Sequence, residues 1–267
     1  MSDDSLPNQI EAAAGYEDLL VPALFQQWTE RVLDAAQIRS GDRVLDVACG
    51  TGVLAREAAG RVGASGSTSG LDPGPGMLAV AERLAPSVDW RLGTAESLPY
   101  KDASFDAVVS QFGLMFFADR RKALEEMLRV LTPGGRLAVA VWDSLDNIPA
   151  YAEEVALLNR MAGENAANAV RAPFALGARA DLMKLFEETA VSSVAIATCT
   201  GTARFSSIRT MVEADLRGWL PVMGIVLGEE QIHSILAKAE SALGRYVTNE
   251  GTAEFAISAH IVTGSKP

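Results

Sequence analysis

Two carboxylates and two glycines are the residues whose types and spacing are best suited to binding a ligand. Asp46 interrupts the apolar run V-L-D-V-A, Gly50 and Gly52 follow it closely, and Asp72 comes later in G-L-D. Glycines let a ligand approach the main chain. A carboxylate about twenty residues beyond such a turn can reach a ribose hydroxyl. The spacing therefore indicates a ligand that carries a sugar.

The charge of Asp46 restricts what that ligand can be. The segment G-T-G-V-L-A, residues 50–55, satisfies the loose G-x-G-x-x-A dinucleotide pattern, which alone is weak evidence for such a ligand. A pyrophosphate suits the positive end of a helix, but Asp46 would repel it. The same carboxylate would suit a ligand that is cationic at this point. S-adenosylmethionine, with its amino group and sulfonium, fits both requirements, while a nicotinamide nucleotide remains an alternative.

These residues require a strand, a tight turn and a helix in direct succession. The apolar run from Val44 is typical of a parallel strand buried on both faces. After the glycines, apolar residues recur at helical spacing: Val53, Leu54, Ala58, Ala59 and Val62. The free N–H groups of that helix would face the ligand in the turn.

The stretch from Val44 to Ala55 resembles the first motif of class I S-adenosylmethionine-dependent methyltransferases. It is most similar to the small-molecule branch that includes the ubiquinone and menaquinone C-methyltransferases. The unit R-V-L-T-P-G-G-R-L, residues 129–137, resembles the same family. One departure is Ala48, which stands where many members have the first of three glycines. We expect a slightly less open turn there.

The resemblance implies further cofactor contacts along the chain. Tyr16 and Trp28 would close the site from an N-terminal segment, Met77 would contact the adenine face, and Pro73 lies beside Asp72. Thr94, Ala95 and Glu96 would contact the edge of the adenine ring. Thr94 replaces a common aspartate, which favours recognition of the adenine by the backbone. Gln111 and Phe112 would lie beside the transferable methyl group. The full predicted set is Tyr16, Trp28, Asp46, Ala48, Gly50, Gly52, Asp72, Pro73, Met77, Thr94, Ala95, Glu96, Gln111 and Phe112.

Several of these residues have simpler interpretations. Trp28 could be core and Tyr16 surface. Asp72 could cap a helix that starts near Pro75, and Met77 could be an adaptable packing residue. Glu96 could be an ordinary carboxylate in the first turn of a helix.

The predicted fold is α/β, a Rossmann-like, mostly parallel seven-stranded sheet with helices on both faces. We expect an N-terminal helical segment (1–40, with a break or fresh start at Pro22), a cofactor-binding core (41–143) and a helical insertion (144–190). The last two strands would fall within 191–267. About fifty residues separate them, too many for a plain loop. We therefore predict a helical cap (about 203–250) over the carboxyl ends of the strands, where open α/β sheets bind ligands.

Composition excludes several classes of function. The 267 residues carry a net charge of −11, which argues against a nucleic-acid substrate. No apolar run reaches the length of a membrane helix, and the acidic start M-S-D-D-S-L-P lacks the features of a secretory signal. A cytoplasmic location is expected. Two cysteines and two distant histidines predict neither a disulfide nor a metal site. A homodimer is possible.

Methyl transfer is an in-line displacement that needs positioning more than a protein nucleophile. Candidate bases are His233, His260, Asp143 and Tyr151, none with convincing spacing, so no catalytic residue is assigned. His260 is expected to be a satisfied core or edge residue and His233 to face solvent. Apolar cap residues suit a small apolar or aromatic acceptor, although each could equally be core: Phe174, Phe205, Met211, Trp219, Leu220, Pro221 and Met223. A non-catalytic cofactor-binding regulator and a nicotinamide oxidoreductase remain alternatives.

Overall fold

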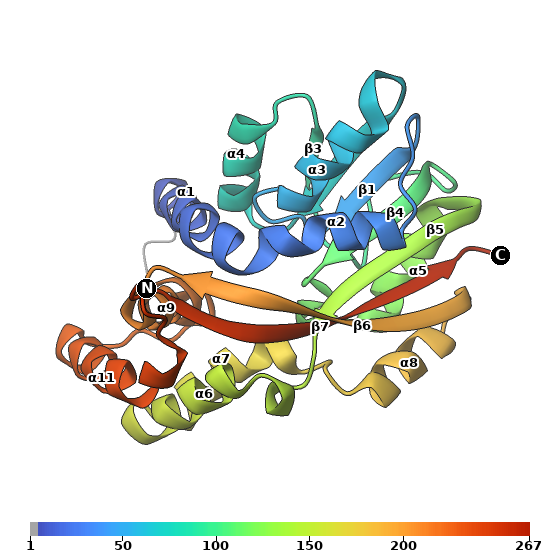
Figure 1. Cartoon of the computed structure of the whole chain (residues 1–267). Helices are drawn as coiled ribbons and strands as arrows, with labels where there is room; N and C mark the ends of the chain where they lie inside the picture. The colour runs from blue at the N-terminus through green and yellow to red at the C-terminus, as the bar shows by residue number, and fades with distance from the viewer. Residues whose placement is uncertain (1–4) are drawn as a thin grey trace.

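The computed structural model describes residues 5–267, and a seven-stranded sheet runs through its centre (Figure 1). The strand order is β3-β2-β1-β4-β5-β7-β6. β7 is antiparallel to both of its neighbours, and the other pairings are parallel. The strands are β1 (Arg43–Val47), β2 (Ser67–Asp72), β3 (Asp89–Leu92), β4 (Phe105–Gln111), β5 (Leu131–Trp142), β6 (Ser192–Phe205) and β7 (Ala253–Ser265).

Helices cover both faces of this sheet. Figure 1 shows α2 (Gln26–Ala35), α3 (Val53–Val62) and α4 (Pro75–Leu84) on one side, and α8 (Arg179–Glu187) on the opposite side, where it packs against α5 (Arg120–Val130). The central strands β1, β4 and β5 are almost completely buried, as parallel strands covered on both faces must be. Their carboxyl ends therefore form a rigid edge on which a site can be built.

The N-terminal segment is one continuous helical run, without the break or fresh helix start expected at Pro22. It comprises α1 (Leu6–Gly15), the π-helix η1 (Tyr16–Phe25) and α2. Proline lacks the N–H that an α-helix needs and crowds the preceding turn. In this structure Pro22 is accommodated inside the wider π-helix, so the predicted break is wrong. The consequence is an unbroken strap from residue 6 to residue 35.

The second half of the chain adds a group of helices beyond the carboxyl ends of β4 and β5. After β5 come η4 (Leu145–Asn147), α6 (Pro149–Met161), α7 (Glu164–Arg171) and η5 (Ala172–Phe174). Residues 206–252, between β6 and β7, form α9 (Ile208–Ala214), η6 (Asp215–Trp219), α10 (Leu220–Val222), α11 (Glu229–Ala242) and η7 (Gly244–Tyr246). α6, α7, α9 and α11 lie together at one end of the molecule (Figure 1). This is the predicted helical cap.

The predicted fold class is confirmed in strand number, mainly parallel order and cap. One local difference is that β5 begins at Leu131, before the P-G-G segment, which forms an irregularity in its pairing with β4. No helix among residues 5–267 combines the length and the apolar character needed to cross a bilayer. The prediction about the acidic start concerns residues 1–7, of which 1–4 lie outside the described part. The segment boundaries given above stay predictions.

Candidate functional site

The turn after β1 is held in a left-handed backbone conformation at three positions. The φ angles are +59° at Ala48, +55° at Gly50 and +86° at Gly52. Glycine adopts such angles freely, whereas alanine pays on the order of 1–2 kcal/mol. The turn closes through hydrogen bonds from the Cys49 N–H to the Leu71 carbonyl and from the Gly52 N–H to the Cys49 carbonyl. Ala48 is therefore a strained position in an otherwise glycine-adapted turn.

Asp72 ties the end of β2 to the glycine turn. Its Oδ2 accepts a hydrogen bond from the Gly50 N–H at 2.8 Å, and its Oδ1 accepts one from the Gly74 N–H at 2.8 Å. Burial raises its pKa, and the two amides partly oppose the shift. Asp72 does not cap α4 itself, because the N-cap residue is Gly74 and no side chain bonds the first N–H groups of that helix; the carboxylate holds the Gly74 amide instead. Each carboxylate oxygen has further lone pairs, so these contacts leave acceptor capacity for a ligand hydroxyl.

Asp46 is a buried carboxyl group that lacks a hydrogen-bond partner within residues 5–267. It is 1% exposed, and neither carboxylate oxygen has a hydrogen-bond partner among the described residues. Burial raises its pKa well above the usual value, and the charge of Asp72 adds to the shift. The Ala55 amide opposes it, although that contact falls outside hydrogen-bond geometry. A buried carboxyl group without partners is costly, which marks Asp46 as a group that a ligand would satisfy.

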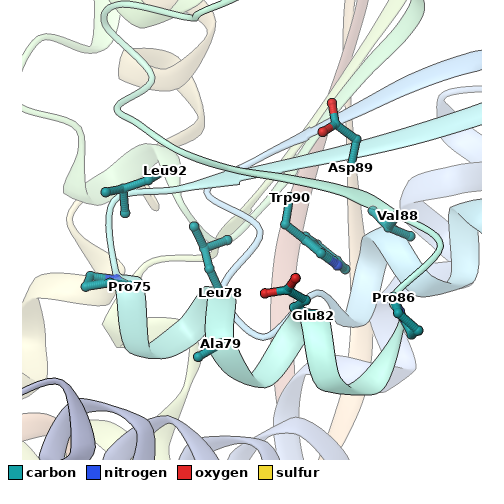
Figure 2. Close-up of a pocket in the computed structure, with 9 residues that line it drawn as sticks. All are labelled: Pro75, Leu78, Ala79, Glu82, Pro86, Val88, Asp89, Trp90 and Leu92. Carbon is teal, nitrogen blue, oxygen red and sulfur yellow. The ribbon is translucent and has the colours of Figure 1, made fainter.

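Trp90 supports the turn from below, a role that the sequence did not suggest. A Cβ placed on Gly52 would come within 2.3 Å of the Trp90 ring, and one placed on Gly70 would also come within 2.3 Å. Its indole Nε1 donates to the Ala85 carbonyl at 2.9 Å. Figure 2 shows the ring between α4 and the neighbouring strands, at the side of a surface groove also lined by Leu78 and Glu82. Gly52 is thus required by packing as well as by its φ angle.

The N-terminal strap lies over this turn. Tyr16 in η1 is near enough to Asp72 and Asp46 for both charges to raise the pKa of its hydroxyl, after the larger effect of burial. Glu17 pairs with Arg56 of α3 at 2.6 Å. A Cβ on Gly76 would lie 2.5 Å from the Gln9 backbone, so α1 rests directly on α4. The strap therefore lies near the region between Asp46 and Asp72, which is called the crevice below, and Tyr16 is half-buried there.

Aromatic residues continue from the crevice to the ends of β4 and β5. Phe112 stacks on Trp142, with ring centroids 3.7 Å apart, and Trp28 meets both rings edge-on. Trp28 is fully buried, which matches its interpretation as core. Gln111 Nε2 donates to the Phe25 carbonyl, and its Oε1 has no partner among the described residues. Gln111 and Phe112 therefore lie at the junction of crevice and cap.

The other predicted contacts lie around the end of β3 and the start of α4. Ala95 is buried, but Glu96 accepts hydrogen bonds from the Ala118 and Asp119 N–H groups at 2.9 and 3.3 Å. Residues 94–97 form a turn, so the first-turn helix interpretation of Glu96 is wrong. Met77 is half-buried beside Gly74, and Pro73 is exposed.

Two of the four candidate bases lie next to each other, with His260 Nε2 3.2 Å from Asp143 Oδ1. His233 is exposed, as predicted. His260 is buried, as predicted, and its Nδ1 and Nε2 are hydrogen-bonded to the Thr198 hydroxyl and the Gly177 carbonyl. Asp143 is occupied by Ser258, Asn147 and the Ser144 amide. Tyr151 is different, because it lines a cavity and burial raises its pKa well above 10. Within residues 5–267, no cluster of three or more His, Cys, Asp or Glu side chains is arranged to hold a metal.

An aromatic cavity of about 120 Å³ lies between the strap, the ends of β4 and β5, and the cap. Its lining is almost entirely apolar, with one carboxylate: Tyr16, Leu20, Leu24, Phe25, Phe112, Phe116, Trp142, Tyr151, Val170, Pro173, Phe174, Asp215, Trp219 and Ile257. Of the predicted cap residues, Phe174 and Trp219 line it. Phe205, Met211 and Leu220 are core, and Pro221 and Met223 are exposed. Tyr16 lines this cavity and also lies near Asp46 and Asp72.

Comparison with known proteins agrees with this geometry. Residues 45–139 match the family model described as "Methyltransferase domain". This part of the chain is similar to a methyltransferase domain. It spans β1 to β5 and therefore contains Asp46, the glycine turn, Asp72 and the 94–96 turn.

The chain is also similar to proteins that are named as methyltransferases of quinone biosynthesis. The chain is 42% identical over 123 residues to the demethylmenaquinone methyltransferase of Paenarthrobacter aurescens, covering 46% of this chain and 47% of that protein. It is 41% identical over 136 residues to the ubiquinone/menaquinone biosynthesis C-methyltransferase of Chromobacterium violaceum, covering 48% and 56%. The chain thus spans about half the length of the curated relatives it matches.

Solved structures share the whole fold. The YcgJ protein of Bacillus subtilis superposes with a TM-score of 0.59 at 20% identity, covering 90% of this chain and 98% of that one. The phosphoethanolamine N-methyltransferase 2 of Haemonchus contortus, crystallised with phosphomonomethylethanolamine and S-adenosylhomocysteine, superposes with a TM-score of 0.60 at 16% identity, covering 96% and 57%. At these identities the likeness establishes the fold and leaves the reaction open.

Proposed function

We propose that the protein binds S-adenosylmethionine in the crevice between Asp46 and Asp72 and transfers its methyl group to a small, largely apolar acceptor. The single observation that carries this proposal is the unpartnered, buried carboxyl group of Asp46 in front of the glycine turn. A dinucleotide would bring a pyrophosphate to that position, where a carboxylate would oppose it. A cationic amino-acid group would instead gain a charge-assisted hydrogen bond.

The residues present fit this cofactor. The Asp46 carboxylate would hold the amino group, Asp72 the ribose hydroxyls, and the 94–96 turn the adenine edge. Phe112 is suited to attract the sulfonium by a cation–π contact, worth about 0.5–2 kcal/mol. When bound, the cofactor supplies an electrophilic methyl group. The strap, through Tyr16, would exclude water from it.

The acceptor would enter the aromatic cavity, which approaches the two carboxylates at Tyr16. Two relatives are named as methyltransferases of menaquinone or ubiquinone biosynthesis, and an aromatic ring suits this lining. A non-catalytic cofactor-binding protein remains the second candidate, because methyl transfer depends on positioning and needs no nucleophile whose loss could be recognised.

Calorimetric titration with S-adenosylhomocysteine tests the cofactor site. We expect saturable binding with one site, and weakening by about 10- to 100-fold in Asp46→Asn, since hydrogen bonds to charged groups contribute about 1.5–3 kcal/mol. Asp106→Asn is the matched control. Asp106, like Asp46, is an aspartate on a central strand, but it pairs with Arg43 of β1 on the surface. Binding of reduced nicotinamide nucleotide without binding of S-adenosylhomocysteine would refute the proposal.

Turnover distinguishes the two candidate functions. Wild-type protein incubated with radiolabelled S-adenosylmethionine and a panel of hydroquinones and phenols should transfer the label to at least one organic-soluble product. Cofactor binding without transfer across the panel would favour the non-catalytic candidate.

A further inference from the structure

The aromatic cavity contains one ionisable carboxyl group that none of the roles above explains. Asp215 of η6 lines the cavity, is 8% exposed, and its Oδ2 has no hydrogen-bond partner among the described residues. Behind it lies Glu154 of α6, 0% exposed, with both carboxyl oxygens equally unpartnered. A buried carboxylate without a cation or amide is expensive. Retention of two of them beside an otherwise apolar cavity points to a ligand.

The two carboxyl groups lie near enough for each to influence the ionisation of the other, although no hydrogen bond of normal geometry joins them. Two carboxylates so close together repel one another when both are charged, so ionisation of one favours the protonated form of the other. Burial raises the pKa of Glu154 well above its usual range and that of Asp215 to about 7. Near neutral pH the pair therefore presents a partly ionised oxygen to the cavity.

Few other charges face this pair. Tyr151 of α6 is the additional titratable group beside it, and both carboxyls raise its pKa. Among the charged residues of the surrounding helices, Arg160 of α6 and Glu164 and Arg171 of α7 are exposed. Glu153 of α6 pairs with Arg245, and Arg209 of α9 pairs with Glu240. Arg217 of η6 is engaged on the surface by Glu213 and Glu229. Within the described residues, no ion pair reaches Asp215 or Glu154, so a ligand would meet their oxygen uncompensated.

A backbone feature coincides with the same cavity. Both π-helical segments of the described chain contribute to its wall, η1 through Tyr16 and Phe25, and η6 through Asp215 and Trp219. Insertions of this kind within α-helices are uncommon and occur frequently at functional sites. Here they turn side chains from two distant helices toward one space.

We propose that Asp215, supported by Glu154, recognises the methyl acceptor by accepting a hydrogen bond from an O–H or N–H group on an otherwise aromatic ligand. The inference rests on the function proposed above. The aromatic walls bind the ring, and Oδ2 selects ligands that carry a protic group. Asp215 is also the acceptor for that group's proton: the O–H or N–H bond breaks, its electron pair stays on the ligand, and the proton passes to Oδ2.

Three probes of nearly equal shape test the proposal without cofactor: 5-indanol, 5-aminoindane and 5-methoxyindane. Calorimetric titration of the wild-type protein at pH 8 should show at least tenfold tighter binding of the hydroxyl or amino compound than of the ether. A preference for one of the two identifies the protic group as O–H or N–H. The preference should fall as the pH is lowered through about 7, because protonation removes the acceptor.

Variants assign the effect to Asp215. Asp215→Leu should bind all three probes equally, and Asp215→Asn, whose neutral amide does not titrate in this range, should lose the pH dependence. Glu213→Gln is the matched control, because Glu213 lies two residues earlier and pairs with Arg217 on the surface. It should keep both the preference and its pH dependence.

Three outcomes would overturn the proposal: equal binding of the three probes to the wild type, absence of binding of all three, or persistence of the preference in Asp215→Leu. Should Asp215→Leu fail to fold by circular dichroism, the pH dependence in Asp215→Asn decides alone. Titration with S-adenosylhomocysteine in parallel separates this result from the cofactor site. Loss of cofactor binding with intact probe preference would refute the proposed function and leave the cavity a binding site of another activity.

Discussion

At the scale of single residues, buried carboxyl groups without hydrogen-bond partners in the described part of the chain lie at both proposed binding spaces: Asp46 at one, and Asp215 with Glu154 at the other. A sequence is informative about such groups where the residue type is rare in its context. Asp46 inside an apolar strand and the two glycines after it could be recognised, because a charge in a buried strand needs a reason. Asp215 and Glu154 could not. Carboxylates in helical patterns usually face solvent, and only the packed structure brings these two together. The supporting role of Trp90 could not be predicted for the same reason, because Gly52 and Gly70, which its ring contacts, lie on other elements.

Ala48→Gly should stabilise the protein modestly. The substitution relieves a left-handed backbone angle of +59°, a gain that the greater freedom of glycine in the unfolded chain partly offsets. We expect an increase of about 0.5–1 kcal/mol in the free energy of unfolding, measured by urea denaturation. Ala79→Gly in α4 is the control and should lose about 1 kcal/mol, because its backbone is helical. Destabilisation of similar size in both variants would show that the Ala48 angle carries no strain.

At the scale of elements, the sheet and its main helices follow from hydrophobic pattern and turn residues, and the deviations have physical causes. The break predicted at Pro22 did not occur, because a π-helix accommodates the ring. The helix start considered as an alternative at Glu96 is a turn, and the Glu96 carboxylate accepts hydrogen bonds from the amides that lead into α5. Such long-range hydrogen bonds leave no periodic trace in a sequence. The strap over the crevice likewise depends on contacts between α1 and α4.

Gly76→Ala should loosen the strap. The added methyl group would meet the Gln9 backbone at 2.5 Å, so α1 must move away from α4. We expect faster amide hydrogen exchange in residues 6–25 and faster dissociation of S-adenosylhomocysteine in stopped-flow measurements.

Gly60→Ala in α3 is the matched control for that substitution. Its Cβ meets nothing within 4 Å, so it should gain about 1 kcal/mol in helix stability with unchanged exchange in residues 6–25. Unchanged exchange in Gly76→Ala would mean that α1 does not seal the crevice.

At the scale of the whole molecule, stability is tied to proton binding in the cap. Asp215 has a folded-state pKa of about 7, above its ordinary value near 4. The folded state therefore binds this proton more tightly than the unfolded state. The contribution of this proton to the free energy of unfolding is fully present below about pH 4 and is lost as the pH rises through about 7. Buried Asp46 and Glu154 shift in the same direction.

Asp215→Asn should flatten this dependence. In the wild type the thermal midpoint should fall between pH 5 and pH 8, and in the variant that decrease should be smaller, measured by scanning calorimetry. Asp106 provides a contrast, because Arg43 lowers its pKa. Its contribution is present above about pH 4 and is lost in acid. Asp106→Asn should therefore lower the midpoint by a constant amount from pH 5 to pH 8, and the difference from the wild type should disappear only at low pH. A midpoint of Asp215→Asn that follows the wild type from pH 5 to pH 8 would contradict the assignment.

The positions of the tryptophans have a practical consequence. The chain has four: Trp142 and Trp219 line the cavity, Trp28 touches Phe112 and Trp142, and Trp90 lies beneath Gly52. Every indole chromophore is thus adjacent to the crevice or the cavity. The intrinsic emission of the unlabelled protein should respond to occupancy of either space, and single Trp→Phe replacements would tell which of the two a given compound has entered.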